Sequence, residues 1–208
     1  MRNNLKFFGR WLRNPARVGS VVPSSRALAA AMAAEIDPLA PGVVVELGGG
    51  TGNITAALLN CGIRPTDIVV IEREASLAEM ITKRFPEVTV ILGDAQHLQS
   101  LLQHAGVGKV KAIVSGLPLL SLPRDTERWI LNQCFAVLPV DGYLVQFTYG
   151  PRAPVERSIA ESLKLMSARV AWVLENLPPA AVWVYRRQAS LLAGTAGTTG
   201  TQGLKRSA

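Results

Sequence analysis

Short apolar runs alternate with amphipathic segments along most of the chain. The runs are rich in valine and isoleucine, which is typical of buried strands, and they predict strands at residues 43–47, 68–72, 88–92, 110–115, 143–149, 169–174 and 181–186. Between them, apolar side chains recur every three or four positions, which predicts helices at 51–60, 75–85, 96–104, 125–138 and 155–166. Asp125 is the expected N-cap of the fourth of these helices.

This alternation of strands and helices predicts the class of fold. Such segments form right-handed βαβ units on a parallel sheet, so we expect an α/β protein with a mostly parallel seven-stranded sheet and helices on both faces. The last two strands are separated by Pro178 and Pro179 and are expected to close the sheet as a hairpin with one antiparallel strand. Ligands of such folds bind at the carboxyl ends of the strands.

The two ends of the chain depart from the pattern. At about 100° per residue, large apolar groups of residues 1–17 fall on one side of a helix and cations on the other. The residues concerned are Leu5, Phe8, Trp11 and Leu12, opposite Lys6, Arg10 and Arg13. This pattern predicts a helix lying in a membrane interface; a helix packed on its own domain and a mitochondrial transit peptide are the alternatives. Residues 189–208 are rich in glycine and threonine and predict a disordered tail, which leaves 18–188 as the folded domain.

Composition and charge narrow the class of protein. The 208 residues are 49% hydrophobic and 18% charged, which excludes a wholly disordered chain. The net charge of +7 is uneven, because residues 1–26 carry six cations and no acid, residues 27–141 have a net charge of −4 and residues 142–208 of +5. The basic ends are expected to meet a membrane surface, a nucleic acid or an acidic partner. Cysteines and histidines number two each and lie in no ligand spacing, so we expect a reducing compartment and no metal site.

No segment is apolar for long enough to predict a helix that spans a membrane. The best candidate, residues 27–34, is ended by Glu35 and Asp37. A secretory signal is not expected either, because arginines interrupt any apolar region near the N-terminus.

A glycine-rich turn follows the first predicted strand, in the sequence ELGGGTG at residues 46–52. Its glycines at 48, 50 and 52 alternate, and Asn53 stands where the dinucleotide fingerprint requires its third glycine. This form suits a nucleoside ligand that has no pyrophosphate. Glu46 would bring a carboxylate to that ligand, which favours an ammonium group over a phosphate.

Acidic residues also end the next two strands. Glu72 is placed to accept hydrogen bonds from ribose hydroxyls, and Asp94 to accept one from the exocyclic amine of adenine. Each acid taken singly is as well explained by an N-cap or a solvated loop end. Their occurrence at the ends of three successive strands favours a nucleoside site.

Taken together, the segments ELGGGTG, IVVIERE and GDA resemble the class I methyltransferases that use S-adenosylmethionine, over about residues 43–186. The resemblance implies a Rossmann-like fold. It also implies a set of cofactor contacts: Glu46 to the methionine amino group, Gly48, Gly50 and Gly52 along the methionine and ribose, Glu72 to the ribose hydroxyls, and Asp94 with Ala95 to adenine.

Flanking segments are similar to those of bacterial phospholipid N-methyltransferases, which extends the likeness to about residues 4–187. They are the amphipathic start, VGSVVPSSRALAAAM (18–32), SGLPLLSLP (115–123) and QFTYGP (146–151). Those enzymes methylate phosphatidylethanolamine stepwise toward phosphatidylcholine. The resemblance implies a cytoplasmic enzyme, peripheral on the inner face of the cell membrane, whose partners are an anionic membrane surface and phospholipid and not nucleic acid. We expect a monomer, although the sequence leaves the oligomeric state open.

Candidate residues for the methyl acceptor follow from this chemistry. The amine must lose a proton before it attacks, and His97 or Tyr149 could relay that proton. Tyr149 could also face the quaternary cation that repeated methylation forms. Class I enzymes contact the target amine after the fourth strand, at Ser115, Gly116 and Leu117 here. Candidates for the lipid phosphate are Arg152, Arg186 and Arg187, the last two being equally explained as a solvated chain end.

Three other functions are alternatives. An RNA adenine N6-dimethyltransferase is similar, but residues 115–119 (SGLPL) lack the asparagine and the aromatic residue of that family's target loop, and little chain is left for its RNA-binding domain. A soluble small-amine methyltransferase leaves the N-terminal helix unexplained. A non-catalytic nucleoside-binding or membrane-adaptor protein leaves the acids at the strand ends unexplained.

Overall fold

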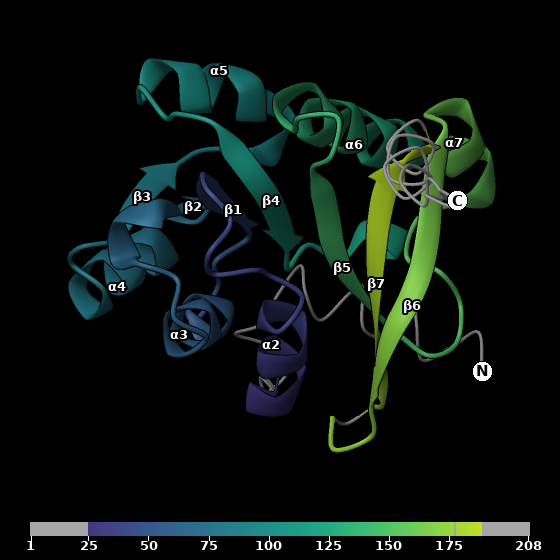
Figure 1. Cartoon of the computed structure of the whole chain (residues 1–208), viewed down its shortest axis with the longest axis horizontal. Helices are drawn as coiled ribbons and strands as arrows, with labels where there is room; N and C mark the ends of the chain where they lie inside the picture. Colours follow the sequence, from purple (N-terminus) through teal and green to yellow (C-terminus); the bar gives the residue numbers. More distant parts are fainter. Residues whose placement is uncertain (1–24, 177, 189–208) are drawn as a thin grey trace, which may run out of the picture.

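A seven-stranded sheet runs through the centre of the computed structural model, which describes residues 25–176 and 178–188 (Figure 1). The strands are β1 (Val43–Leu47), β2 (Ile68–Glu72), β3 (Thr89–Leu92), β4 (Val110–Ser115), β5 (Tyr143–Tyr149), β6 (Leu165–Val173) and β7 (Ala180–Arg187). Their order across the sheet is β3-β2-β1-β4-β5-β7-β6. β1 to β5 are parallel, and β7 is antiparallel to both of its neighbours. The predicted α/β fold and its closing hairpin are confirmed.

Helices cover both faces of the sheet. The α-helices are α2 (Arg26–Ala33), α3 (Asn53–Asn60), α4 (Ala75–Arg84), α5 (Leu98–His104), α6 (Arg124–Val137) and α7 (Arg157–Ser162). Short 3-10 helices are η2 (Pro65–Asp67), η3 (Ala95–His97) and η4 (Leu119–Ser121). Figure 1 shows α5, α6 and α7 on one side of the sheet and α2 and α3 on the other. Each side has its own apolar core, because successive strand residues point to opposite faces.

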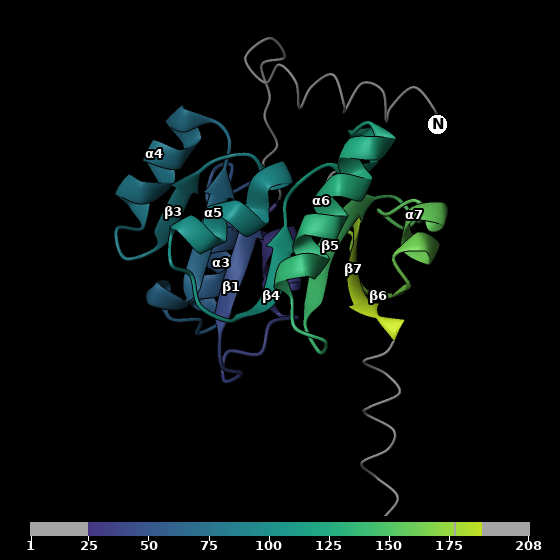
Figure 2. The same cartoon turned by 90° about the horizontal axis from the view of Figure 1, so that it is seen from above.

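Three predicted boundaries are wrong. The helix predicted at 155–166 is the six-residue α7, and β6 begins at Leu165, four residues before the predicted strand. β6 pairs with β7 on both sides of a bulge between Arg169 and Ala171, so tertiary pairing overrides the helix preference of its leucine, methionine and alanine. The short α7 lies beside these two strands (Figure 2). Pro123, not Asp125, is the N-cap of α6, and Asp125 lies in the first turn.

α2 was not among the predicted helices, and its start is fixed to a distant part of the chain. The Ser25 hydroxyl oxygen accepts a hydrogen bond from the backbone N–H of Leu28, at 3.1 Å, and so caps the helix. The backbone N–H of Ser25 in turn donates to Oδ1 of Asn176, also at 3.1 Å. Asn176 is buried in the turn between β6 and β7, which ties the first described residue to that turn.

Two predicted segments, the amphipathic helix over residues 1–17 and the tail over 189–208, lie outside the described residues. The folded-domain boundaries of 18–188 therefore stay a prediction. Within residues 25–176 and 178–188, no helix is both long and apolar enough to cross a membrane.

Candidate cofactor and acceptor site

The glycine turn between β1 and α3 lies at the carboxyl edge of the sheet. Gly48, Gly50 and Gly52 all have positive φ, at 74°, 53° and 78°. A Cβ atom on Gly48 would also lie 2.9 Å from Cδ2 of Leu117, in the loop after β4. Position 48 therefore requires glycine for its backbone conformation and for its approach to Leu117.

Gly49 was not predicted as a site residue, yet it is the most tightly enclosed residue of the turn. A Cβ atom there would lie 2.5 Å from side-chain carbons of both Val70 and Ile81. No flexible polar group can move aside, because both neighbours belong to the core beneath the turn. Gly49 thus lets the turn pack directly on β2 and α4.

Glu46 is fully buried at the end of β1, on the side of the sheet that α3 covers. Its Oε2 accepts a hydrogen bond of 2.6 Å from the Thr55 hydroxyl. Its Oε1 is buried and has no hydrogen-bond partner among the described residues. Burial raises the pKa of Glu46 to about 8, and the charge of Glu72 adds to the rise while Thr55 opposes it. One carboxylate oxygen is therefore left for a donor that residues 25–176 and 178–188 do not supply.

Glu72 supports the glycine turn from the end of β2. Its Oε2 accepts from the backbone N–H of Gly50 and its Oε1 from that of Glu74, both at 2.9 Å. Each carboxylate oxygen has a further lone pair, so Glu72 can hold the turn and still accept from a diol. The predicted contact with ribose is compatible with this geometry and stays a prediction.

Asp94 is half-buried after β3 and caps η3. Its Oδ1 accepts from the backbone N–H of Gln96 at 2.9 Å, and its Oδ2 lies 3.9 Å from the Arg73 guanidinium. The N-cap interpretation of Asp94 is therefore correct, and the adenine contacts of Asp94 and the buried Ala95 stay predictions. His97 is exposed at the end of η3, and its role as a proton relay also stays a prediction.

The residues at this edge of the sheet fit the ammonium group of the methionine part of S-adenosylmethionine, the predicted cofactor. An amino acid ammonium has N–H groups to donate to the unpartnered Oε1 of Glu46, and its positive charge would favour the ionised carboxylate. The positive-φ glycines leave the approach to the strand ends free of side chains. We therefore regard the edge formed by β1, β2 and β3 as the candidate cofactor site.

The loop after β4 lies directly beside the glycine turn. The backbone N–H of Gly116 donates to the Leu47 carbonyl oxygen at 2.8 Å, and a Cβ atom on Gly116 would lie 2.8 Å from the Gly48 carbonyl oxygen. Ser115 is buried and its hydroxyl oxygen accepts from the Leu117 N–H at 3.3 Å. The predicted acceptor loop is thus held against the candidate cofactor site.

Both backbone groups of Leu117 are engaged within the chain, which contradicts the prediction that they meet the substrate amine. The Leu117 carbonyl oxygen accepts from Nε2 of Gln146 at 2.8 Å and from the Leu119 N–H at 3.0 Å. A carbonyl oxygen has two lone pairs, so neither remains for a ligand. Among the described residues no hydrogen bond reaches the Gly116 carbonyl oxygen, so its role toward the amine is compatible with the structure and stays a prediction.

Tyr149 ends β5 at the same edge of the sheet. It is half-buried and stacks edge-to-face on Phe147, with ring centroids 5.3 Å apart and an interplanar angle of 78°. Burial raises the pKa of Tyr149 above its ordinary value of 10.0, so its phenol stays neutral near pH 7. Tyr149 can offer an aromatic face or a hydroxyl group, but a neutral phenol is a poor proton acceptor.

Arg186 and Arg187 are at the wrong end of the sheet for a headgroup site. β7 is antiparallel to β5, so Arg186 pairs with Tyr143 at the start of β5, while Tyr149 pairs with Ala180. That separates the arginines from the carboxyl edge by the length of β5, or roughly 20 Å. Arg187 donates to the carbonyl oxygens of Phe135, Leu138 and Pro139 and so closes the end of α6.

Of the three predicted phosphate ligands, Arg152 alone lies at the carboxyl edge. It is exposed in the loop that follows β5. Its role toward a headgroup stays a prediction.

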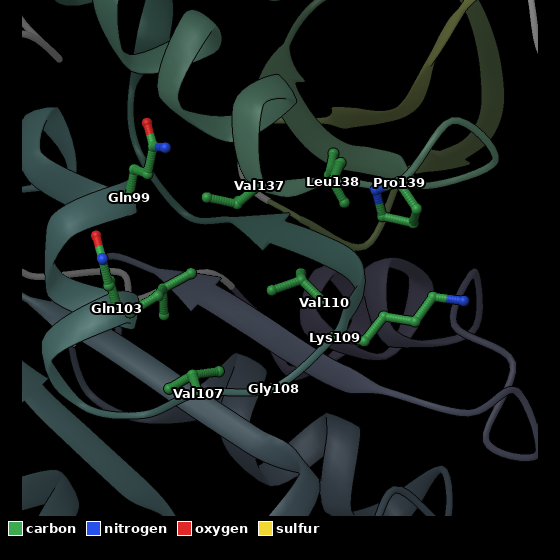
Figure 3. A pocket seen from close by; sticks show the side chains of 10 residues that line it. Gln99, Gln103, Val107, Gly108, Lys109, Val110, Val137, Leu138 and Pro139 are labelled. Atoms are coloured by element: carbon green, nitrogen blue, oxygen red, sulfur yellow. The ribbon is translucent and has the colours of Figure 1, made fainter.

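A shallow pocket of about 390 Å³ lies at the opposite, amino edge of the sheet (Figure 3). Gln99 and Gln103 of α5, Val110 at the start of β4 and Val137 at the end of α6 line it. It contains none of the predicted site residues and is separate from the candidate cofactor site.

Two polar residues of the site were missed. Thr55 binds Glu46, and Gln146 holds the acceptor loop. Gln146 had a signal in the sequence, because it is a polar side chain inside the otherwise apolar start of β5. Thr55 had a weaker signal, as a polar residue on the inward face of a helix.

The strand order, the glycine turn and the acids at the strand ends together define the Rossmann-like fold of class I S-adenosylmethionine-dependent methyltransferases. The 1,6-didemethyltoxoflavin-N1-methyltransferase from Burkholderia thailandensis shares the fold with a TM-score of 0.61 at 15% identity, over 88% of this chain and 87% of that one. Magnesium protoporphyrin IX methyltransferase from Synechocystis, solved with bound S-adenosylmethionine, does so with a TM-score of 0.58 at 13% identity, over 89% and 97% of the two chains.

One relative matches in sequence over almost its whole length. The ornithine lipid N-methyltransferase of Singulisphaera acidiphila is 29% identical over 191 residues, which cover 89% of this chain and 97% of the relative. No family model matches the chain.

Proposed function

We propose that this chain is an S-adenosylmethionine-dependent N-methyltransferase that acts on the primary amine of a membrane-lipid headgroup. The observation that carries the proposal is the unpartnered Oε1 of the buried Glu46, placed beside a glycine turn that touches the loop after β4. Solved structures of the same fold contain S-adenosylmethionine or S-adenosylhomocysteine, which supports the choice of cofactor.

The cofactor supplies an electrophilic methyl group on a sulfonium. Glu46 neutralises the ammonium group of its methionine part, and Glu72 accepts from its ribose hydroxyls. The ammonium group of the substrate would first lose a proton to water, because only the neutral amine has a lone pair. The Gly116 carbonyl oxygen would accept an N–H of that amine and so direct its lone pair away from the loop. As the N–C bond forms, the bond between sulfur and the methyl group would break, and the methylated amine would release its extra proton to water. Orientation and exclusion of water are the main contributions of the chain, since no strong base lies in the loop.

The headgroup must combine a primary amine with an anion. Phosphatidylethanolamine, which the sequence motifs favour, has an amine and a phosphate. Ornithine has an amine and a carboxylate, and the relative of almost equal length is named for ornithine lipid. Both lipids offer the same chemistry to the chain, and an assay with each of them separates the two.

Membrane attachment is the second part of the proposal. Residues 1–17 would lie in the interface, with Lys6, Arg10 and Arg13 facing anionic lipid and Trp11 inserted. Each cation contributes at most about 1 kcal/mol near such a surface, so attachment weakens with salt. We also propose that the enzyme is a monomer, peripheral on the inner face of the cell membrane.

The deciding experiment measures the transfer of labelled methyl groups. The full chain is incubated with labelled S-adenosylmethionine and with phosphatidylethanolamine liposomes, ornithine lipid liposomes or RNA. Label is expected in one of the lipids and absent from RNA, and Glu46→Gln is expected to abolish it. Label in RNA, or in neither lipid, contradicts the proposal.

A separate measurement tests membrane attachment. Removal of residues 1–17 is expected to abolish sedimentation with anionic liposomes and to leave the affinity for S-adenosylmethionine unchanged. If the shortened chain sediments as the full chain does, attachment does not depend on this segment.

A further inference from the structure

The outer half of the sheet carries an arginine that the sequence did not single out. Arg169, on the edge strand β6, has its guanidinium carbon 4.8 Å from the ring centroid of Trp172 and 6.0 Å from that of Trp183. Trp172 is on the same strand and Trp183 on the neighbouring β7. The two indoles hold the flat guanidinium by cation–π contacts, which leave its N–H edge able to bind an anion.

This cluster is joined to the acceptor loop by strand register. Ser115 pairs with Gln146, Gln146 with Trp183, and Trp183 with Arg169. Side chains of directly paired residues point to the same face of a sheet, so the four form one row across β4, β5, β7 and β6. The row begins beside the glycine turn and ends about 14 Å away at the exposed edge of the sheet.

The middle of this row has polar atoms without partners. Oε1 of Gln146 and Nε1 of Trp183 are both buried and have no hydrogen bond to any described residue. Gln146 is fully buried, and its Nε2 holds the Leu117 carbonyl oxygen. From the loop outward the row therefore presents an acceptor, then a donor, then a cation. A headgroup with its amine at the loop and its anion farther out has the complementary order.

Among the described residues Arg169 has no acidic partner, whereas two arginines near the carboxyl ends of the strands do. Arg73 lies near Asp94, and Arg124 pairs with Glu156. In the part of the chain that the structure describes, Arg169 has no ion pair, and its guanidinium contacts the two indoles. With Arg186 and Arg187 at the amino edge, Arg152 is the one predicted partner left for the headgroup anion, and it has no aromatic contact that fixes it among the described residues.

We propose that Trp172, Arg169 and Trp183 form the subsite for the anionic group of the lipid headgroup, phosphate or carboxylate, whose amine is methylated beside Ser115 and Gly116. The inference rests on the proposed function, because it assigns a place to the second group of that substrate. Arg169 binds the anion, Trp183 donates to it from its indole N–H, and Gln146 accepts from the amine side.

Steady-state methylation by the Arg169→Gln variant tests the subsite, with the lipid amine that the wild-type chain uses. Loss of one charge-assisted contact is expected to raise the KM for the lipid about tenfold to a hundredfold, with little change in kcat. The KM for S-adenosylmethionine and the sedimentation with anionic liposomes are expected to be unchanged. Arg169→Lys keeps the positive charge but loses the planar guanidinium with its paired N–H groups, so its KM for the lipid should lie between those of the wild type and Arg169→Gln.

Arg186→Gln is the matched control. Arg186 also stacks on an aromatic ring, with its guanidinium carbon 4.1 Å from the Tyr143 centroid, but at the amino edge of the sheet. Its KM for lipid is expected to equal that of the wild type. Equal KM values for Arg169→Gln and the wild type overturn the subsite while leaving lipid methylation intact. Absence of lipid methylation by the wild-type chain overturns the proposed function and the subsite together.

Discussion

The amino and carboxyl edges of the sheet differ in whether the hydrogen-bonding groups of their polar side chains find partners within the described residues. At the amino edge, charged groups are satisfied by the chain: Arg187 donates to carbonyl oxygens at the end of α6, and Nζ of Lys111 donates to the carbonyl oxygens of Asp37 and Ala40. At the carboxyl edge, polar groups are buried with a bonding position left over, as in Glu46 and Gln146. Unsatisfied buried groups cost stability, so their concentration at one edge indicates where a ligand is expected.

Glu46→Gln should have the largest effect on the carboxyl edge. The amide keeps the shape but loses the charge that attracts an ammonium group, so the affinity for S-adenosylmethionine should fall more than about a hundredfold. Calorimetric titration measures the affinity. Glu127→Gln is the control, because Glu127 is also buried and its pKa is also raised by burial, but it binds the N–H of Glu156 away from the glycine turn. An equal loss in both variants would show that Glu46 acts only through stability.

The charge of Glu46 should also make the stability of the cofactor-free chain depend on pH. Its pKa is about 8 in the folded chain against an ordinary value of 4.5. Between these values the folded state holds a proton that the unfolded state has lost, so the free energy of unfolding should fall as pH rises from about 5 to about 8. At about 1.4 kcal/mol per pKa unit the total is a few kcal/mol. Denaturant unfolding at several pH values measures it, and Glu46→Gln should flatten the curve.

Gly49→Ala should destabilise the fold by about 1–3 kcal/mol, because the added Cβ atom meets Val70 and Ile81 at 2.5 Å and the core must shift. Thermal unfolding measures the loss. Gly108→Ala, in the amino-edge loop before β4, adds a Cβ atom with nothing within 4 Å and should leave the melting temperature nearly unchanged. If both variants lower the melting temperature by the same amount, the close packing of Gly49 is not the cause of the loss.

Gln146→Leu should have the smallest effect. Loss of the bond to the Leu117 carbonyl oxygen should loosen the acceptor loop and lower kcat about tenfold, with the KM for S-adenosylmethionine unchanged. Thr148→Val is the control, since Thr148 is buried two positions along the same strand and so on the same face. An unchanged kcat in Gln146→Leu would show that the loop keeps its position without the hydrogen bond from Gln146 to Leu117.

Much of this arrangement was predictable from local sequence. The strands are mostly continuous apolar runs, and each of the first three has an acid within two residues of its end, so the order of the residues alone places Glu46, Glu72 and Asp94 at one edge. The position of Arg186 could not be predicted, because it depends on the direction of β7, which only long-range pairing decides. Arg169 was missed for a related reason: β6 was predicted to begin at this residue, and its two indole neighbours come together only through the hairpin and the bulge between Arg169 and Ala171.

The hydrogen bond between Ser25 and Asn176 would have a mechanical consequence if the substrate is a lipid that stays in a bilayer, as proposed. β6 runs parallel to β5, so the turn that contains Asn176 lies at the carboxyl edge, where the Gly150 N–H also donates to the Pro179 carbonyl oxygen. Membrane binding by residues 1–17, as proposed, would therefore act on the same edge of the sheet at which the proposed amine substrate would enter. On the proposed function, the domain would approach the bilayer with its candidate cofactor and acceptor site facing the lipid.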